Sequence, residues 1–341
     1  MTSYLTEGKN AFGAILADGW YSGYIGYALL IGNPVVRNFY GDVPLLKAQI
    51  KVEYENGEKE LIVTDDSWKT NYGPIVEADI LNGETYDANL EFEGWGSIGF
   101  DDSIWKKSTV YSDETGRQIE SYPGNQIKVF QELKTKTVTA KPEGKYIFDL
   151  GQNFAGVVKL KVKGNKGDVI TLRYGEMLFP NGDLMTENLR KARAVDTYIL
   201  KGNPEGETWM PQFTYHGFQY VEVSGFRAEP SPDAITGIVL GSSTPVVGTF
   251  ETDNKMVNQL YHNICWTQRS NYFDVPTDCP QRDERLGWTG DAQAYIQSAT
   301  FNNDIAAFFN KWLVDLNDAQ RADNTYPLYA PAPNIRKTDT Y

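Results

Sequence analysis

Cysteine and histidine are scarce in this chain of 341 residues, which contains two of each. Cys265 and Cys279 are too few for a disulfide framework, so we expect reduced thiols, and these favour a cytoplasmic location. The cysteines and the histidines, His216 and His262, are scattered rather than grouped at metal-ligand spacing. The sequence therefore predicts no transition-metal site and no cofactor.

Basic residues are also fewer than acidic residues. Lysine and arginine total 32 against 45 acids, a net charge of -13. Nucleic acids and anionic membranes are bound by basic surfaces, so neither is an expected partner. No apolar run approaches the roughly 20 residues of a membrane span, and no signal peptide opens the chain. The 41% hydrophobic and 23% charged shares are typical of globular proteins.

Short alternating segments and turns dominate the first two thirds of the chain. Residues 1–125 include an expected strand at 11–16 and a hairpin, 46–54 with 59–64, joined by a Glu-Asn-Gly-Glu turn. We predict an incomplete β-sandwich here, because the chain begins in the middle of a β pattern. The amino end therefore looks cut.

A second run of short strands covers residues 126–246. Expected strands at 145–149 and 157–162 flank a turn at 151–156, and another strand follows at 169–174. Regular short strands with turn signals favour a second β-sandwich.

Helical periodicity replaces the strands from residue 247 onward. Thr252 is the expected cap of a helix with apolar positions three and four residues apart, and further helices start near Asp291 and Asn303. Two or three amphipathic helices cannot enclose a core by themselves. We therefore expect residues 247–341 to be the start of an α-helical domain, with the carboxyl end also cut.

The richest stretch for chemistry is the loop at 274–291. It holds five acids, two arginines and Trp288 in 18 residues. A surface loop with two arginine–carboxylate bridges would need no tryptophan, and a buried loop cannot hold five carboxylates unless they are paired or used. Loops on rigid scaffolds are where functional sites usually lie, so this loop is the candidate site.

The segment Asp278-Cys-Pro-Gln-Arg-Asp-Glu-Arg-Leu-Gly-Trp-Thr-Gly-Asp291 resembles the active-site motif of bacterial inverting α-L-rhamnosidases, glycoside hydrolase family 78. Segments at 11–23, 83–88, 148–156, 174–178 and 213–218 resemble flanking parts of the same family, so the resemblance covers essentially the whole chain. It implies that residues from about 247 begin an (α/α)6 barrel. It also implies that the partners are rhamnose-containing glycosides or oligosaccharides.

Inverting glycoside hydrolysis needs one carboxylic acid and one carboxylate base, roughly 6.5–9.5 Å apart. The resemblance assigns the general acid to Glu284, with the adjacent Asp283 as the rival if the alignment slips by one position. It places the general base beyond Tyr341, and no residue of this chain matches the motif of that base. We therefore predict that the chain by itself does not hydrolyse rhamnosides.

Further roles carry over by resemblance, each beside a structural alternative. Asp278 and Arg282 resemble residues that hold rhamnose hydroxyls, or they form an ion pair that fixes the loop. Trp288 packs against the deoxysugar or is a core tryptophan. Asp291 binds sugar or caps the next helix. Cys279 is expected to be structural.

A polar loop in the first region offers a second candidate site. Glu84, Asp87 and Asn89 are candidates to hold calcium or a sugar, as the amino-terminal β-domains of some relatives do; the alternative is a hydrogen-bonded turn. If this loop binds sugar, the alternative function of the chain is that of a pair of carbohydrate-binding β modules that bind sugar without hydrolysing it. Another (α/α)6 glycosidase or lyase would fit the fold but leave the loop motif unexplained.

Overall fold

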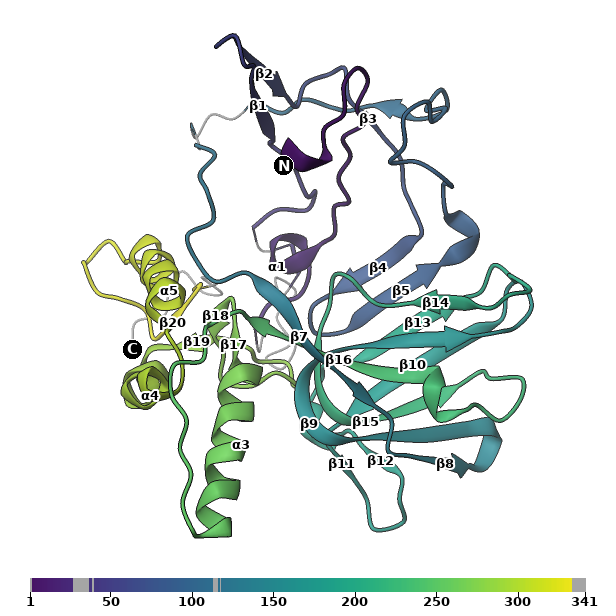
Figure 1. Cartoon of the computed structure of the whole chain (residues 1–341), viewed down its shortest axis with the longest axis vertical. Coiled ribbons are helices and arrows are strands. Elements are labelled where there is room, and N and C mark those ends of the chain that lie inside the picture. Colours follow the sequence, from purple (N-terminus) through teal and green to yellow (C-terminus); the bar gives the residue numbers. More distant parts are fainter. Residues whose placement is uncertain (1, 27–36, 39, 113–115, 117, 333–341) are drawn as a thin grey trace.

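The computed structural model describes residues 2–26, 37–38, 40–112, 116 and 118–332. Strands make up most of the regular structure, and the three longer helices follow late in the chain (Figure 1). These helices are α3 (Lys255–Asn271), α4 (Thr289–Asn302) and α5 (Ala306–Asp318). The prediction of a mostly β chain ending in helices is confirmed. Within the described ranges, no helix combines the length and apolarity that crossing a membrane requires.

A ten-stranded sheet forms the centre of the molecule. Its main path runs β4 (Ile75–Asp79), β5 (Gly83–Asp87), β13 (Val195–Ile199), β10 (Val169–Gly175), β15 (His216–Ser224), β9 (Lys145–Val162), β16 (Ile235–Ser242) and β7 (Ile127–Lys134). Two more strands, β8 (Thr137–Lys141) and β14 (Glu207–Trp209), pair with β9. Strands β5 and β13 run parallel. Residues 75–87 thus join the sheet formed by strands from 126–246, while the domain boundary near residue 125 stays a prediction.

Strand β9 runs without a break through the turn predicted at 151–156, so that prediction was wrong. Gly151 has φ +74°, which a glycine adopts at little cost, and this lets the chain bend inside the strand. The pairing with β15 shifts register between Phe218 and Tyr220. A Cβ on Gly156 would lie 2.0 Å from the Ile238 carbonyl oxygen, so the two strands approach each other closely only because residue 156 is glycine.

Alternating side chains of the central strands form the main core. Residues 170, 172 and 174 of β10 point to the same face because strand side chains repeat every two residues, and all three are buried. The core also takes Phe148, Phe154 and Leu160 from β9. Each such apolar side chain contributes about 1.5–3 kcal/mol when it leaves water.

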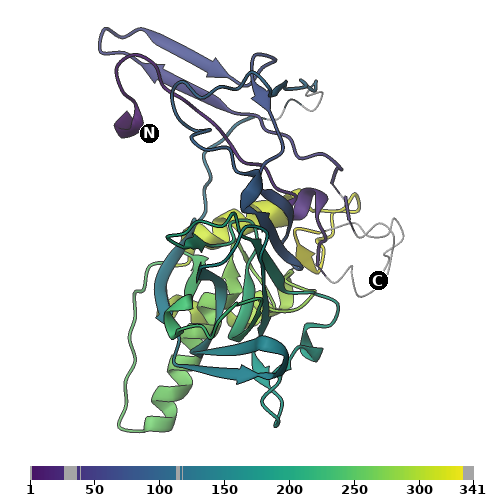
Figure 2. The same cartoon turned by 90° about the vertical axis from the view of Figure 1, so that its right-hand side faces the viewer.

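The predicted hairpin near the amino end is confirmed as β1 (Gln49–Glu53) paired with β2 (Lys59–Val63). It extends away from the main sheet (Figure 2). The strand predicted at 11–16 was wrong. Those residues belong to no strand, and Gly13 lies against the Trp95 ring instead of a neighbouring strand.

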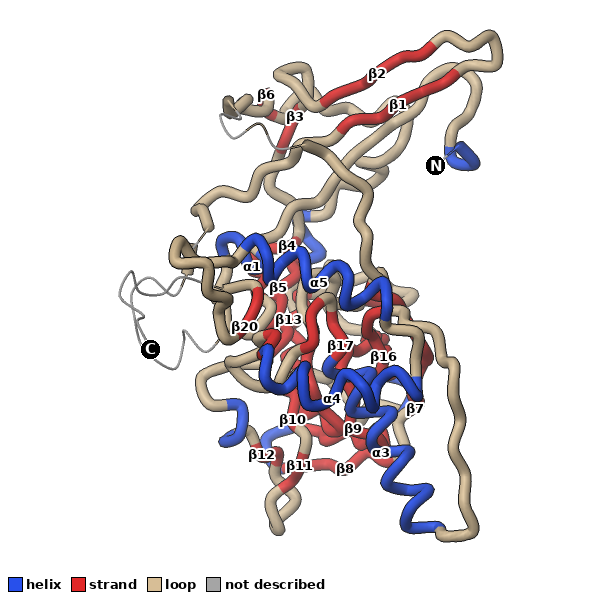
Figure 3. Tube along the Cα trace, turned by 90° about the vertical axis from the view of Figure 1, so that its left-hand side faces the viewer, coloured by secondary structure: helices blue, strands red, loops and turns tan. Residues whose placement is uncertain are grey.

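Helix α3 begins after Asn254, whose side chain accepts hydrogen bonds from the backbone of Met256 and Val257. The predicted cap Thr252 instead bonds to Asn258. The three helices lie on one side of the sheet (Figure 3). At the end of α3, the Ser270 hydroxyl accepts a 3.2 Å hydrogen bond from Ala155 N of β9. This contact places the loop after α3 beside the sheet.

The remaining elements are short. They are η1 (Thr2–Tyr4), α1 (Gly19–Ser22), β3 (Lys69–Thr70), η2 (Ala88–Leu90), β6 (Lys106–Lys107), η3 (Pro142–Gly144), β11 (Met177–Leu178), β12 (Leu184–Met185), η4 (Glu187–Leu189), η5 (Pro232–Ala234), β17 (Tyr272–Phe273), β18 (Val275–Pro276), β19 (Gly287–Trp288) and β20 (Tyr329–Ala330).

Candidate active site

Short backbone pairings hold the loop between α3 and α4 in a closed form. Strand β17 turns back onto β18, Thr277 bridges to Gly287, and β19 pairs with β20. The Asp278 amide donates to the Leu286 carbonyl at 3.1 Å. The residues between 278 and 286 therefore form a loop fixed at both ends.

Glu284 lies inside this loop with only 4% of its surface exposed. Its Oε1 accepts hydrogen bonds from Trp288 Nε1 at 2.5 Å and Leu286 N at 3.2 Å. Its Oε2 accepts from Arg285 N at 2.6 Å and from the Cys279 thiol at 3.3 Å. A carboxyl with both oxygens engaged in this way is held in one orientation.

Burial is the main cause that raises the pKa of Glu284 above its ordinary value. The hydrogen bond from Trp288 acts against this, while the negative charge of Asp278 adds to it; the bonds from Cys279 and Leu286 also lower the pKa. The net direction is upward. That direction suits a group that must hold a proton near neutral pH and then release it.

Asp278 and Arg282 are partly exposed charged residues close to Glu284. They form an ion pair of 2.5 Å, and their side chains are 28% and 30% exposed. The ion pair leaves part of each group accessible. Asp278, Cys279 and Glu284 bring one ligand atom each within 4.8 Å of one another. Burial raises the pKa of Cys279 to about 12, however, so the thiol stays protonated at neutral pH, which disfavours metal binding.

Asp283 is fully buried and turns toward the β region rather than toward Asp278. Its Oδ1 lies 3.8 Å from Nη1 of Arg190, which follows η4. Burial is the main cause that raises the pKa of Asp283, and Arg190 is among the groups that oppose it. The two adjacent acids of the motif thus have different surroundings.

Trp288 is half-buried, and its ring packs edge-on against Tyr329, with ring centroids 5.0 Å apart. Asp291 is exposed in the first turn of α4, whose N-cap position is occupied by Trp288. The helix-cap alternative for Asp291 was therefore wrong. A carboxylate in the first turn still interacts favourably with the helix dipole.

The amino-terminal candidates do not converge. Glu84 and Asp87 are three residues apart on β5, so their side chains point to opposite faces of the strand. Glu84 is buried and accepts hydrogen bonds from Gln212 N and Phe213 N. Asp87 accepts from both the backbone and the side-chain amide of Asn89, so these two form the hydrogen-bonded turn.

His216 is a core residue. Its ring lies 3.1 Å from the Asp196 carboxylate and stacks on Tyr174, and Asp196 and Tyr174 are both buried. Tyr174 donates a 2.6 Å hydrogen bond to the same Asp196 carboxylate. Glu84 N donates to it as well, at 2.8 Å. This network links β5, β10, β13 and β15.

Two contributions to the site escaped the sequence interpretation. Cys279, expected to be only structural, donates a hydrogen bond to Glu284. Arg285 is completely buried, and its guanidinium bonds to the backbone carbonyls of Ile80 and Tyr215. No local spacing signals the Arg285 contacts, because the two partners are 205 and 70 residues away in sequence.

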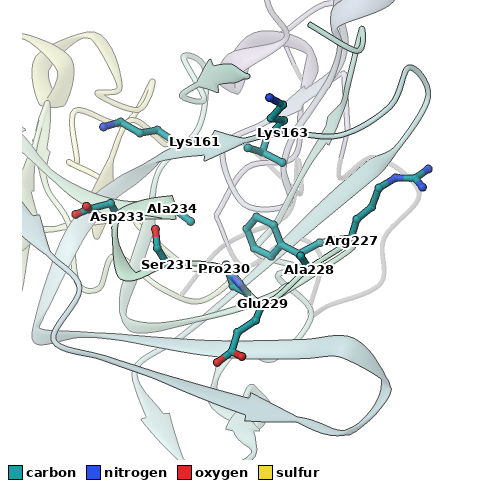
Figure 4. Close-up of a pocket in the computed structure, with 11 residues that line it drawn as sticks. Lys161, Lys163, Arg227, Ala228, Glu229, Pro230, Ser231, Asp233 and Ala234 are labelled. Carbon is teal, nitrogen blue, oxygen red and sulfur yellow. The ribbon is translucent and has the colours of Figure 1, made fainter. Parts of the chain in front are cut away.

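A shallow hollow of about 280 Å³ lies elsewhere, between the end of β9 and the segment before η5. None of its lining residues belongs to the loop at 274–291. The Lys161 and Arg227 side chains extend in opposite directions from it (Figure 4). Ligand sites need polar groups that converge, so this hollow is not the candidate site.

Three family models match successive parts of the chain. They describe an α-L-rhamnosidase N-terminal domain at residues 1–131, a bacterial α-L-rhamnosidase concanavalin-like domain at 139–241, and a bacterial α-L-rhamnosidase six-hairpin glycosidase domain at 245–341. The chain belongs to the bacterial α-L-rhamnosidase family. The last model begins close to residue 247 and includes the whole loop of Glu284.

The sequences of two α-L-rhamnosidases align with nearly the whole length of this chain. An α-L-rhamnosidase of Streptomyces avermitilis is 45% identical over 332 residues, which are 97% of this chain and 32% of that protein. One of Formosa agariphila is 38% identical over 336 residues, 97% of this chain and 35% of the relative. The chain therefore spans about a third of the length of these relatives.

The crystal structure of Streptomyces avermitilis α-L-rhamnosidase complexed with L-rhamnose is similar to this structure. Its TM-score is 0.87 at 44% identity, over 92% of this chain and 30% of that one. The structure of this chain thus matches a solved member of the family.

Proposed function

We propose that this chain contributes the general acid of an inverting α-L-rhamnosidase, with Glu284 as the proton donor to the departing glycosidic oxygen. The observation that carries the proposal is the position of Glu284. It is a buried carboxyl with a raised pKa, next to the partly exposed pair Asp278 and Arg282. Asp283 fits the role less well, because it faces Arg190 of the β region.

The substrate is proposed to be a terminal α-L-rhamnoside. The Streptomyces avermitilis relative was solved in complex with L-rhamnose. A partly exposed carboxylate can accept hydrogen bonds from sugar hydroxyls, and a guanidinium can donate to them; these are the proposed roles of Asp278 and Arg282. Trp288 presents the ring that would contact the apolar C6 methyl side of the sugar. Asp291, one turn into α4, is the outermost proposed contact.

Asp278 is not the proposed base. Its carboxylate lies within 4.8 Å of Glu284, which is shorter than the roughly 6.5–9.5 Å that leaves room for an attacking water. One of its two carboxylate oxygens, Oδ2, also pairs with Arg282. The base is proposed to come from sequence that follows this chain.

The two β regions are proposed to be sandwiches, and the helices are proposed to be the start of an (α/α)6 barrel.

Rhamnose binding and rhamnoside hydrolysis test the proposal separately. Calorimetric titration of the 341-residue chain with L-rhamnose should show binding that Asp278→Ala abolishes and Glu84→Ala retains. Binding lost only in Glu84→Ala would instead favour a carbohydrate-binding β module. An aryl α-L-rhamnoside should be cleaved, with inversion seen by NMR, by the longest reading frame that contains this chain and not by the chain alone. Release of rhamnose by the pure chain would contradict the assignment of the base.

A further inference from the structure

Arg285 is the largest of the fully buried side chains in the part of the chain that the structure describes, and it lies in this loop. Its guanidinium donates to the carbonyl of Ile80, between β4 and β5, at 2.6 Å. It also donates to the carbonyl of Tyr215, just before β15, at 2.8 Å, and it lies over the Tyr215 ring at 4.6 Å. Among the described residues no carboxylate pairs with it. A buried cation held only by carbonyls and a ring is costly to maintain, so its placement calls for a reason.

The backbone of Arg285 is also unusual, because its φ is +63°. A residue with a side chain adopts this left-handed conformation only where its surroundings impose it. In this conformation the successive N–H groups of residues 285 and 286 both point at the Glu284 carboxyl, at 2.6 and 3.2 Å. Consecutive N–H groups arranged in this way form an anion-binding nest. The carboxyl of Glu284 is thus held by the backbone of the residue that follows it.

These two observations have one explanation. We propose that Arg285 is a positioning residue: its guanidinium, anchored on the Ile80 and Tyr215 carbonyls, keeps residue 285 left-handed and thereby keeps two N–H groups on the Glu284 carboxyl. The importance of this carboxyl for catalysis rests on the proposed function. The anchoring itself does not depend on it.

An arginine suits this position for a physical reason. Nη1 of its guanidinium donates to both carbonyls while the guanidinium also lies over the Tyr215 ring, and a lysine ammonium has no planar group to stack there. Its charge also points away from Glu284, toward the two carbonyls of the β region, and the pKa of Glu284 stays raised despite a cation at the next residue. The hydrogen bonds that fix the loop to the β region therefore lie away from the Glu284 carboxyl.

Two substitutions separate positioning from a merely structural role. Arg285→Met removes the anchor and penalises the left-handed backbone, whereas Arg285→Gly removes the anchor but adopts that backbone freely. Glycine leaves the larger cavity, so it should lower the melting temperature more than methionine does. The titration of Glu284 should follow the opposite order. It should move to higher pH most in Arg285→Met, because the N–H groups that favour the carboxylate are lost.

The measurement is ¹³C NMR of glutamate side-chain carboxyls in this chain, with the Glu284 signal assigned from its loss in Glu284→Gln. Arg269→Met is the matched control. Arg269 packs on the Phe130 and Trp266 rings, so this variant should lose stability without moving the Glu284 titration. Arg285→Met should also bind rhamnose about tenfold more weakly, or worse.

An unchanged Glu284 titration in folded Arg285→Met, or equal shifts in the methionine and glycine variants, would overturn the inference. If neither variant folds, Arg285→Lys is the test, with a smaller shift in the same direction expected and no shift counting against the inference. The NMR readout needs no turnover. A chain that fails to bind rhamnose but shows the predicted order of shifts would therefore refute the proposed function alone.

Discussion

Glu84 and Glu284 are two buried glutamates in different parts of the molecule, exposed by 1% and 4%. Each accepts two backbone N–H groups: Gln212 and Phe213 donate to Glu84, while residues 285 and 286 donate to Glu284. Burial is the leading cause that raises the pKa of both, and it brings that of Glu84 to about 7. In burial and in the direction of the pKa shift the two carboxyls are alike, but Glu284 also accepts hydrogen bonds from two side chains, Trp288 and Cys279.

The accessibility of the neighbouring residues distinguishes Glu84 from Glu284. Glu84 adjoins the buried Asp196 network, which gives a ligand no route to it. Glu284 adjoins Asp278 and Arg282, which keep about a third of their side chains in solvent. A perturbed carboxyl therefore indicates a site only when reachable polar groups surround it. Glu84 instead holds the strands together.

The largest expected effect is on catalysis. Glu284→Gln should lower rhamnoside hydrolysis by the longest reading frame by roughly 10²–10⁴-fold, because the proton donor is lost. The melting temperature should change little. Asp283→Asn is the matched control and should lose much less activity. Comparable losses in the two variants would break the distinction between the adjacent acids.

Glu84→Gln should act on stability rather than on activity. The pKa of Glu84 in the folded chain, about 7, lies above its ordinary 4.5, so folding favours the protonated form. Its contribution is fully present below pH 4.5 and is lost as pH rises through 7, a change on the order of 3 kcal/mol. Glutamine cannot titrate, so denaturant unfolding at pH 5 and pH 8 should show a weaker pH dependence in the variant. An unchanged pH dependence would show that Glu84 does not titrate in this range.

Trp288→Phe should sharpen the comparison at the other carboxyl. It keeps a ring beside Tyr329 but removes the N–H that donates to Glu284, a bond that lowers the pKa of that group. The alkaline limb of the pH–rate profile should therefore move to higher pH, with a smaller loss of rate than in Glu284→Gln. A shift to lower pH would contradict the hydrogen-bond assignment.

The smallest effect is expected at the exposed turn beyond Glu84. Asp87→Ala removes the acceptor for Asn89 and should cost about 0.5–1 kcal/mol in unfolding free energy. Because we expect no calcium in this loop, EDTA should leave the melting temperature of the parent chain unchanged. A fall on chelation would revive the calcium alternative.

Local patterns predicted local structure well. The Asn-Gly turn of the β1–β2 hairpin and the helical periodicity after residue 247 are visible in short windows. The continuous path of β9 is not, because Gly151 and Gly156 resemble turn residues. In the folded sheet Gly156 pairs with both β15 and β16, and Gly151 supplies the bend within the strand. The motif pointed to Glu284 by resemblance, but two adjacent acids differ only in what each faces after folding. The role of Arg285 depends on carbonyls distant in sequence, which no local pattern reports.

Strand β9 hydrogen-bonds with four other strands, β8, β14, β15 and β16. Opening it requires breaking ladders on both of its edges at once, so its amides should be among the slowest in the chain to exchange with deuterium. The hairpin β1–β2, which forms a sheet of two strands in the described part of the chain, should exchange early. Loss of β9 would free the His216–Phe218 end of β15, which pairs with β9, whereas Tyr220–Ser224 would still pair with β10. The Tyr215 carbonyl adjoins the freed end, so the loop around the acid should open in the same cooperative event as the sheet.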